Sequence, residues 1–211
     1  MAIEYIFPIA IYKNSVPDIL PLGEEMFREA MFFERAKDKT RTTLLSYNAG
    51  GPNEVSWNPL EKSKYKPFVD AVINEARKYL IEMKYDNYTP IVSSMWLNEM
   101  STGSEQPLHT HYGATMSGCF YVDSPIGAQD IWFLKSDMNV CSPYLQFAKE
   151  IHKGNAVQQS VSTEKGNIVM FPSNLHHMVP GGKFDGLRRS IAFDIVFKAP
   201  EARFREGKSV L

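Results

Sequence analysis

The spacing of apolar residues along the chain changes near residue 90. Between Lys66 and Lys84 the apolar residues recur at helical spacing, with charged residues between them, and Pro67 suits a first turn. Leu22 to Lys37 is also predicted to be helical. Acidic residues lie near its start, where the positive end of the helix dipole stabilises them. A strand within the first 13 residues, ended by Pro17, is expected to precede both helices.

After Pro90 the apolar runs become short and β-like, and glycines, prolines and polar clusters separate them. This pattern is typical of an all-β sandwich or barrel, with the N-terminal helices against one face. Residues 135–155 interrupt it and are expected to be irregular, with a short helix over 144–152. This loop is a candidate lid, since long loops in compact domains are often functional. The runs predicted to be strands are IVSSMWLNEM, TMSGCFYVD, DIWFL, QQSVST, NIVMF and RSIAFDIVF.

We expect one domain over residues 1–211, because its length suits one sizeable core and no linker or repeat divides it. Residues 1–89 would supply a strand and supporting helices, 90–199 the β-barrel core, and 200–211 a tail. SYNAGGPNEVSW, at 46–57, is predicted to be a loop because of its two glycines and proline.

The composition bears on the partners and the cellular compartment of the protein, but not on its chemistry. The net charge is −1, so nothing favours nucleic acid or an anionic membrane as a partner. Cys119 and Cys141 are the two cysteines, which we interpret as free thiols in a reducing compartment. The N-terminus lacks a basic region typical of a secretory signal, and no apolar run approaches the ~20 residues that span a bilayer. A cytoplasmic location is expected.

The stretch PLHTHYGATMSG contains the first candidate metal ligands, His109 and His111. In a strand, residues i and i+2 point to the same side, so both imidazoles would share one face. The pair alone is a weak signal, because polar pairs at this spacing also occur on any half-exposed strand.

The surrounding spacing strengthens the interpretation. Gly103, five residues, His109, one residue and His111 resemble the start of the first cupin motif. GNIVMFPSNLHHMVPGG resembles the second, with asparagine where glycine is usual, and its spacing selects His177. Because successive strand residues alternate in direction, His176 is then expected to be a surface neighbour.

Three imidazoles with other positions open suit Fe(II), Zn(II), Ni(II) or Cu(II), and an open ligand set favours catalysis over a closed structural site. No glutamate follows His111 at the cupin distance, so the usual fourth protein ligand is missing. A metal-free cupin-like barrel with hydrogen-bonded core histidines remains an alternative.

Eleven residues after His177, Arg188 and Ser190 share one face of a predicted strand. In a barrel with a ligand in its mouth, this guanidinium and hydroxyl would suit a carboxylate. The alternative is an exposed strand start carrying basic residues.

The order His-x-His, distal His, then Arg-x-Ser resembles the Fe(II)- and 2-oxoglutarate-dependent oxygenases. The likeness is strongest to the prolyl 4-hydroxylase-like members found in phage and marine bacterial genomes. This family has a double-stranded β-helix, or jelly-roll (cupin-like), core, so the resemblance implies a mainly β fold with flanking helices (α+β). The stretches that carry it are IFPIAIY, SYNAGG, HTHYGATMSGCFYV, GNIVMFPSNLHHMV and RRSIAF.

The resemblance implies that His109 and His177 are iron ligands. His111 stands where most of these oxygenases have an acidic residue, so either it ligates in place of the carboxylate or water or substrate fills that position. Arg188 and Ser190 would bind the distal carboxylate of 2-oxoglutarate.

Two further residues have implied roles in this pocket. Tyr121 stands where prolyl-hydroxylase-like enzymes have a tyrosine that shares the 2-oxoglutarate carboxylate; the alternative is a core tyrosine. Asn98, on the preceding strand, is a candidate pocket residue. Trp96 and Trp132 are candidates for lining a substrate pocket, although aromatic residues in strands are more often core.

The implied activity is oxidation by Fe(II), 2-oxoglutarate and O2, most simply hydroxylation of a small molecule or a protein side chain, with 2-oxoglutarate decarboxylated to succinate. One alternative is a three-histidine cupin dioxygenase that does not use 2-oxoglutarate, in which Arg188 binds the substrate's carboxylate. Another is a non-catalytic small-molecule-binding barrel. A phage origin would place the chain in the host cytoplasm, and a homodimer is left open.

Overall fold

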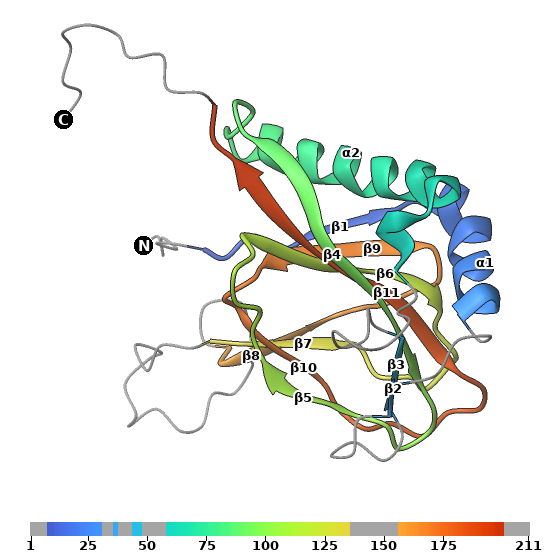
Figure 1. Ribbon diagram of the computed structural model, residues 1–211. Coiled ribbons are helices and arrows are strands. Elements are labelled where there is room, and N and C mark those ends of the chain that lie inside the picture. Colours follow the sequence, from blue (N-terminus) through green and yellow to red (C-terminus); the bar gives the residue numbers. More distant parts are fainter. Residues whose placement is uncertain (1–7, 31–35, 38–43, 48–57, 136–155, 201–211) are drawn as a thin grey trace, which may run out of the picture.

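Two antiparallel β-sheets face each other in the computed structural model, which describes residues 8–30, 36–37, 44–47, 58–135 and 156–200 (Figure 1). The large sheet has the strand order β1-β9-β6-β11-β4-β3-β2, and the small sheet has the order β5-β10-β7-β8. From β4 to β11 the chain passes repeatedly between the two sheets, which is the jelly-roll arrangement that the resemblance implied.

The strands of the large sheet differ greatly in length. β4 and β11 are the longest, and they pair along their whole length. The large sheet consists of β1 (Tyr12–Ser15), β2 (Ala36–Lys37), β3 (Leu44–Tyr47), β4 (Thr89–Met100), β6 (Met116–Asp123), β9 (Asn167–Pro172) and β11 (Arg188–Lys198). The small sheet consists of β5 (Gln106–His109), β7 (Ile131–Leu134), β8 (Gln158–Val161) and β10 (His176–Val179).

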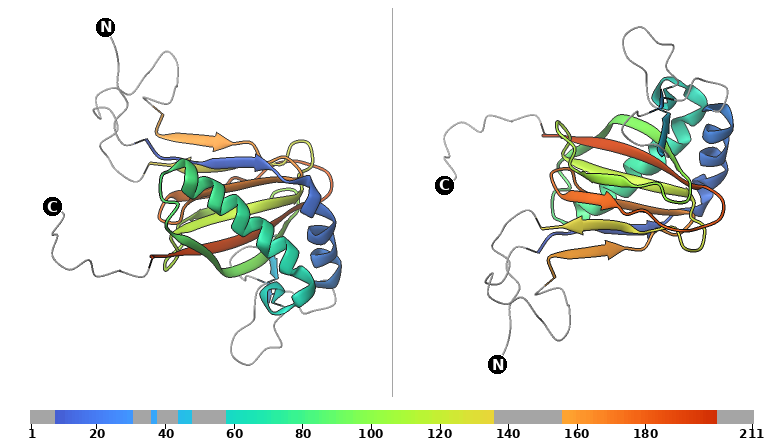
Figure 2. Two further views of the ribbon diagram at one scale, coloured as in Figure 1. Left: turned by 90° about the horizontal axis from the view of Figure 1, so that it is seen from above. Right: turned by 90° about the horizontal axis from the view of Figure 1, so that it is seen from below.

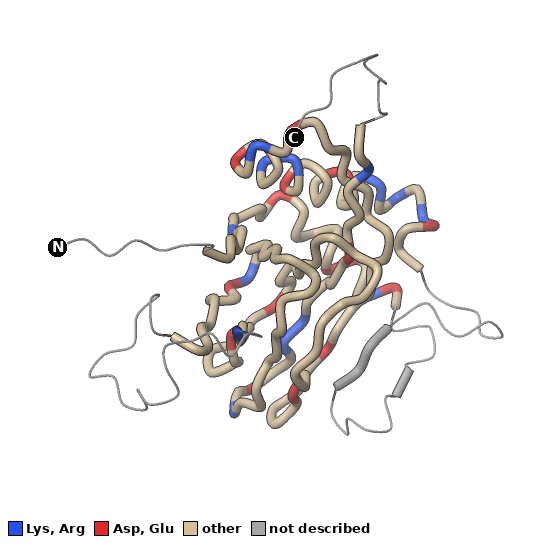
Figure 3. Tube along the Cα trace, turned by 90° about the vertical axis from the view of Figure 1, so that its left-hand side faces the viewer, with Lys and Arg blue, Asp and Glu red and all other residues tan. Residues whose placement is uncertain are grey.

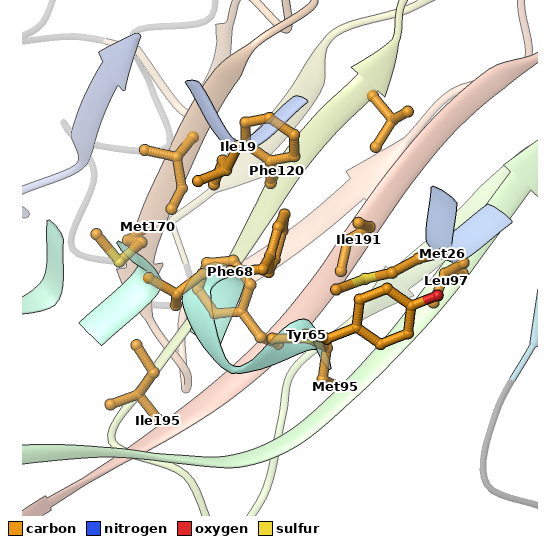
Figure 4. Close-up of a cluster of buried hydrophobic side chains, with 14 of the residues drawn as sticks. Ile19, Met26, Tyr65, Phe68, Met95, Leu97, Phe120, Met170, Ile191 and Ile195 are labelled. Carbon is orange, nitrogen blue, oxygen red and sulfur yellow. The ribbon is translucent and has the colours of Figure 1, made fainter. Parts of the chain in front are cut away.

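Two helices cover the outer face of the large sheet (Figure 2). These are α1 (Leu20–Ala30) and α2 (Lys66–Glu82); short 3-10 turns, η1 (Pro17–Ile19), η2 (Pro59–Glu61) and η3 (Ser63–Tyr65), lead into them. Apolar side chains from both helices pack against the sheet, and the Phe68 and Phe120 rings meet edge to face at 5.4 Å (Figure 4). This core contains Ile19, Met26, Phe27, Tyr65, Phe68, Val72, Met95, Leu97, Phe120, Met170, Ile191, Phe193 and Ile195.

A second apolar cluster fills part of the space between the sheets. It joins Tyr121 and Phe171 of the large sheet to Phe133 of the small sheet. The large sheet is therefore buried on both faces: its outer face contacts the helices, and its inner face contacts the small sheet. The side chains on the inner face are those that can reach a site between the sheets.

A buried carboxylate, that of Glu75, links α2 to β1 at the edge of the large sheet. The carboxylate of Glu75 is almost fully buried, and it accepts hydrogen bonds from Tyr12 Oη (2.6 Å), Asn14 Nδ2 (2.7 Å) and Lys78 Nζ (2.6 Å). Burial opposes ionisation of Glu75, but these donors outweigh it and hold the pKa of Glu75 below its ordinary value. The ionised carboxylate thus stabilises the packing of α2 on β1.

Charged residues of both signs are interspersed along the described trace (Figure 3). Neither α1 nor α2 has the length and apolar character of a membrane-spanning helix.

Most elements lie where the local pattern predicts them. The predicted second helix corresponds to α2, and the six β-like runs correspond to β4, β6, β7, β8, β9 and β11. The first strand is shifted: β1 begins at Tyr12, where it pairs with β9.

The predicted end of the first helix, at Lys37, is wrong. α1 ends at Ala30, and Ala36–Lys37 form β2, which pairs with β3. Pairing with the next strand, β3, overrides the local helical tendency. β3 also takes up the first two residues of the predicted loop at 46–57; the rest of that loop and the predicted helix at 144–152 lie outside the described residues.

Candidate active site

Three imidazoles converge between the sheets. One ligand atom from each of His109, His111 and His177 lies within 4.8 Å of the others. The ring centroids are 4.2 Å apart for His109 and His177, and 5.2 Å apart for each pair that includes His111. His109 ends β5 directly opposite His177 on β10, so the pairing of these two strands brings the two histidines together.

His111 joins this cluster for a reason that differs from the prediction. It lies beyond the end of β5, so strand alternation does not orient it. Its backbone N–H donates to the carbonyl of Ser173 (2.9 Å), and its ring stacks on Trp96 with centroids 5.5 Å apart. The predicted convergence is thus present, but contacts with other segments produce it.

Each imidazole is held by its Nδ1 atom. Nδ1 of His109 contacts the carbonyl of Pro107 (2.7 Å), and Nδ1 of His177 contacts that of Leu175 (2.9 Å). Nδ1 of His111 contacts Oδ1 of Asp194 at 2.7 Å. Carbonyl and carboxylate oxygens accept hydrogen bonds, so Nδ1 carries the proton in each ring and the Nε2 lone pairs are the candidate metal ligands.

The surroundings of His177 keep it neutral. Burial, together with the nearby His109, lowers the pKa of His177 to about 3. The Phe171 ring lies 4.5 Å from the His177 ring and shields it from water. A neutral imidazole at physiological pH is the form that binds a metal ion.

The neighbouring His176 stays outside the cluster, as predicted, but it is half-buried rather than a surface residue. Its Nδ1 atom is buried and has no hydrogen-bond partner among the described residues.

Asp194 is the acidic residue beside the cluster. Burial opposes its ionisation, but hydrogen bonds from His111, Ser117 and Ser94 outweigh burial and hold the pKa of Asp194 below its ordinary value. The sequence indicated no role for Asp194. Trp96 was recognised only as a candidate pocket residue, and its contact with His111 depends on tertiary structure.

The second part of the site lies on the inner face of the large sheet, where Arg188 and Ser190 are only 3% and 2% exposed. Across the strands, Ser190 lies opposite Tyr121 of β6 on one side and Asn98 of β4 on the other. The guanidinium carbon of Arg188 lies 5.1 Å from the centre of the Tyr121 ring. The four predicted pocket residues therefore share one region, and the solvent-exposed alternative for Arg188 is wrong.

Arg188 and Tyr121 have unused hydrogen-bond donors in this region. Nε of Arg188 and the Tyr121 hydroxyl are buried without a hydrogen-bond partner among the described residues. Nη1 of Arg188 contacts the thioether of Met100 at 3.4 Å, a weak acceptor. Burial raises the pKa of Tyr121, so its hydroxyl remains a donor. A buried cation beside an unused hydroxyl is suited to bind an anion.

The apolar cluster between the sheets connects the histidines to Arg188 and Tyr121. Phe171 contacts the His177 ring, and Tyr121, in the same cluster, contacts Arg188. Cys119, a free thiol, also packs against the cluster, and burial raises its pKa to about 11, so the thiol is protonated. Cys141 and residues 136–155, which contain most of the predicted lid, lie outside the described residues.

Comparisons with known proteins agree with this geometry. Residues 94–194 match the family described as "Putative 2OG-Fe(II) oxygenase". No curated protein sequence matches the chain.

Solved structures share the fold at low sequence identity. A prolyl-4-hydroxylase from Pseudomonas putida has a TM-score of 0.58 at 12% identity, covering 89% of this chain and 92% of that one. HygX from Streptomyces hygroscopicus, with nickel, 2-oxoglutarate and hygromycin B bound, has a TM-score of 0.57 at 12% identity, covering 92% and 84%. The α-ketoglutarate-dependent epimerase SnoN from nogalamycin biosynthesis has a TM-score of 0.63 at 10% identity, covering 96% and 88%. The match over residues 94–194 together with the shared double-stranded β-helix fold indicates a 2-oxoglutarate-dependent oxygenase, an oxidoreductase.

Proposed function

We propose that this protein is a dioxygenase that uses Fe(II), 2-oxoglutarate and O2 to hydroxylate a small molecule or a protein side chain. One observation carries the proposal: three imidazoles converge between the two sheets, in contact with the apolar cluster that also borders a buried guanidinium whose Nε has no hydrogen-bond partner among the described residues. The first feature suits a metal ion and the second suits a carboxylate.

The metal would be held by Nε2 of His109, His111 and His177. Their Nδ1 atoms are already occupied by acceptor oxygens, so the rings need no change of tautomer to bind. Three imidazoles leave other coordination positions open, as a catalytic site requires.

2-Oxoglutarate would be held at its distal carboxylate by Arg188, Ser190 and Tyr121. The unused donors of Arg188 and Tyr121 fit this group, because a carboxylate offers several acceptor sites. Asn98 lies opposite Ser190 and would line the same pocket. The buried position of Arg188 strengthens its attraction for an anion relative to that of a surface arginine.

When bound, Fe(II) with 2-oxoglutarate and O2 supplies the oxidation of a C–H bond, with 2-oxoglutarate converted to succinate and CO2. The chain contributes orientation and protection. Arg188 and Tyr121 fix one end of the cosubstrate, and Phe133 and Phe171 exclude water from the His177 side. The substrate class stays open, since the structural neighbours include a prolyl hydroxylase and a protein with hygromycin B bound.

The test is to add Fe(II) and then 2-oxoglutarate without oxygen, and to admit air after recording the spectrum. We expect a visible charge-transfer band that requires both additions, and succinate once air is admitted. His177→Ala should lose the band, and Arg188→Gln should need far more 2-oxoglutarate to form it.

Two other results would redirect the proposal. Within the residues that the structure describes, the histidine cluster includes no carboxylate, which favours, as a second candidate, a three-histidine dioxygenase that needs no 2-oxoglutarate. Oxygen uptake with a small thiol, without the band, would support that candidate. Neither band nor oxygen uptake would support a binding protein without turnover.

A further inference from the structure

We propose that Asp194 is a positioning residue that orients His111 as a metal ligand and strengthens it through an ionic hydrogen bond. This inference rests on the proposed metal site. Asp194 lies on the inner face of β11, and its Oδ1 atom is 2.7 Å from Nδ1 of His111. Both side chains are largely shielded, with exposures of 16% for Asp194 and 13% for His111, so water competes weakly for the bond.

Two serines donate to the Asp194 carboxylate, and a third contacts one of these serines. Ser117 Oγ donates to Oδ1 of Asp194 (2.6 Å), and Ser94 Oγ donates to Oδ2 (3.1 Å). The single proton of Ser117 is used in this bond, so in the 2.9 Å contact between Ser117 and Ser173 it is Ser173 that donates. The order of donation therefore runs from Ser173 through Ser117 to Asp194, which also accepts from His111.

This chain of hydrogen bonds joins both metal-binding segments. Ser173 belongs to the segment that leads to His177, and its carbonyl accepts the backbone N–H of His111. One network thus fixes His111 at two points: Ser173 holds its backbone, and Asp194 holds its ring. Trp96 packs on the face of the ring. A change in Asp194 should therefore alter the metal site through His111.

The support for His111 differs in kind from that of the other two histidines. His109 and His177 each contact a neutral carbonyl two residues earlier in the chain. His111 instead contacts an anion 83 residues away. A carboxylate partner makes a coordinating imidazole more basic and fixes its orientation. It also adds a negative charge one hydrogen bond away from a ligand set that contains only neutral imidazoles.

Two substitutions separate charge from geometry. Asn in place of Asp194 retains an oxygen that accepts from His111 but removes the charge, and it retains the side-chain shape. Ala removes both the charge and the acceptor. Loss of an outer partner of this kind typically weakens metal binding by roughly 10- to 100-fold. We therefore expect weaker binding in the order wild type, Asp194→Asn, Asp194→Ala.

The experiment titrates the metal-free full-length protein with Co(II) and records calorimetry and the visible absorption of the bound ion. The panel is wild type, D194N, D194A, H111A, the double variant D194A/H111A and D70N. Asp70 pairs with Lys66 on the exposed surface of α2, so D70N controls for loss of one carboxylate and should bind as wild type does. Circular dichroism and thermal melting test folding; D194N keeps the comparison valid if D194A does not fold.

The decisive readout is non-additivity. If Asp194 acts through His111, D194A should cost little once His111 is absent, and D194A and H111A should change the Co(II) spectrum in the same way. Wild-type affinity and spectrum in D194N and D194A, or additive losses in the double variant, would overturn the inference while leaving the metal site intact. Failure of the wild type to bind Co(II) would instead overturn the proposed metal site, and this inference with it.

Discussion

The guanidinium of Arg188 stacks over the ring of Tyr121 at 5.1 Å, and both side chains are buried with a donor that has no partner among the described residues. The adjacent Arg189 is different: it points to the other face of β11, donates to Glu99 (3.0 Å) and lies over the Phe27 ring. Two consecutive arginines therefore have opposite roles. One is paired within the protein, and the other is available to an anion.

Arg188→Met should abolish 2-oxoglutarate binding without destabilising the ligand-free protein. The substitution removes a buried cation that forms no ion pair within the described part of the chain, and replacing such a charge by an apolar side chain of similar size is often neutral or stabilising. Thermal melts in the presence of Mn(II), with and without 2-oxoglutarate, check this. The ligand-induced increase in Tm should disappear.

Arg189→Met is the matched control. It leaves the buried carboxylate of Glu99 without this partner, which should cost about 3 kcal/mol of stability. The increase in Tm on adding 2-oxoglutarate should persist. A large loss of stability in Arg188→Met, or retention of its 2-oxoglutarate response, would contradict our assignment of Arg188.

Tyr121→Phe should weaken 2-oxoglutarate binding and leave the fold unchanged. The hydroxyl has no partner to lose within the described residues, whereas a hydrogen bond to a charged ligand contributes about 1.5–3 kcal/mol, or at least roughly tenfold in affinity. The KM for 2-oxoglutarate in a succinate assay measures the effect. Tyr12→Phe, which loses its hydrogen bond to Glu75, should show the reverse: a lower Tm and the same KM.

Glu75→Gln should destabilise the protein at pH 7 by about 1–3 kcal/mol, because three donors lose a charged acceptor. The pKa of Glu75 is lower in the folded than in the unfolded state, so its contribution is present above the unfolded value of about 4.5 and is lost as pH falls through the folded value. Urea denaturation at pH 7 and at several values below pH 4.5 tests this. The difference between wild type and variant should shrink as pH falls; a constant difference would contradict it.

Gly118→Ala should destabilise the barrel severely. An added Cβ would lie 2.6 Å from the backbone carbonyl oxygen of Val169 and 2.7 Å from the Phe193 ring. The carbonyl belongs to the adjacent strand β9 and cannot move without disturbing the ladder, so we expect a loss of about 2 kcal/mol or more. Denaturant midpoints measure it. Ile126→Ala, at a fully exposed position, should change the midpoint little.

The sequence by itself determined the features that depend on local periodicity. The helical spacing predicted α2 to within two residues, and strand alternation placed Arg188 and Ser190 on one face of their strand, where both are buried. Motif spacing selected His109 and His177, which lie opposite each other in paired strands. These predictions succeeded because main-chain geometry repeats every two or 3.6 residues, whatever the rest of the fold does.

Only the tertiary structure decided which face of the large sheet is the interior of the site, and which partners each side chain meets there. The inner face of the large sheet is covered by the small sheet, so Arg188 is buried although its strand begins with basic residues. His111 is oriented by Trp96 and by Asp194, which are 15 and 83 positions away. Contacts between segments this distant depend on how the sheets pack, and no local pattern of residues encodes that.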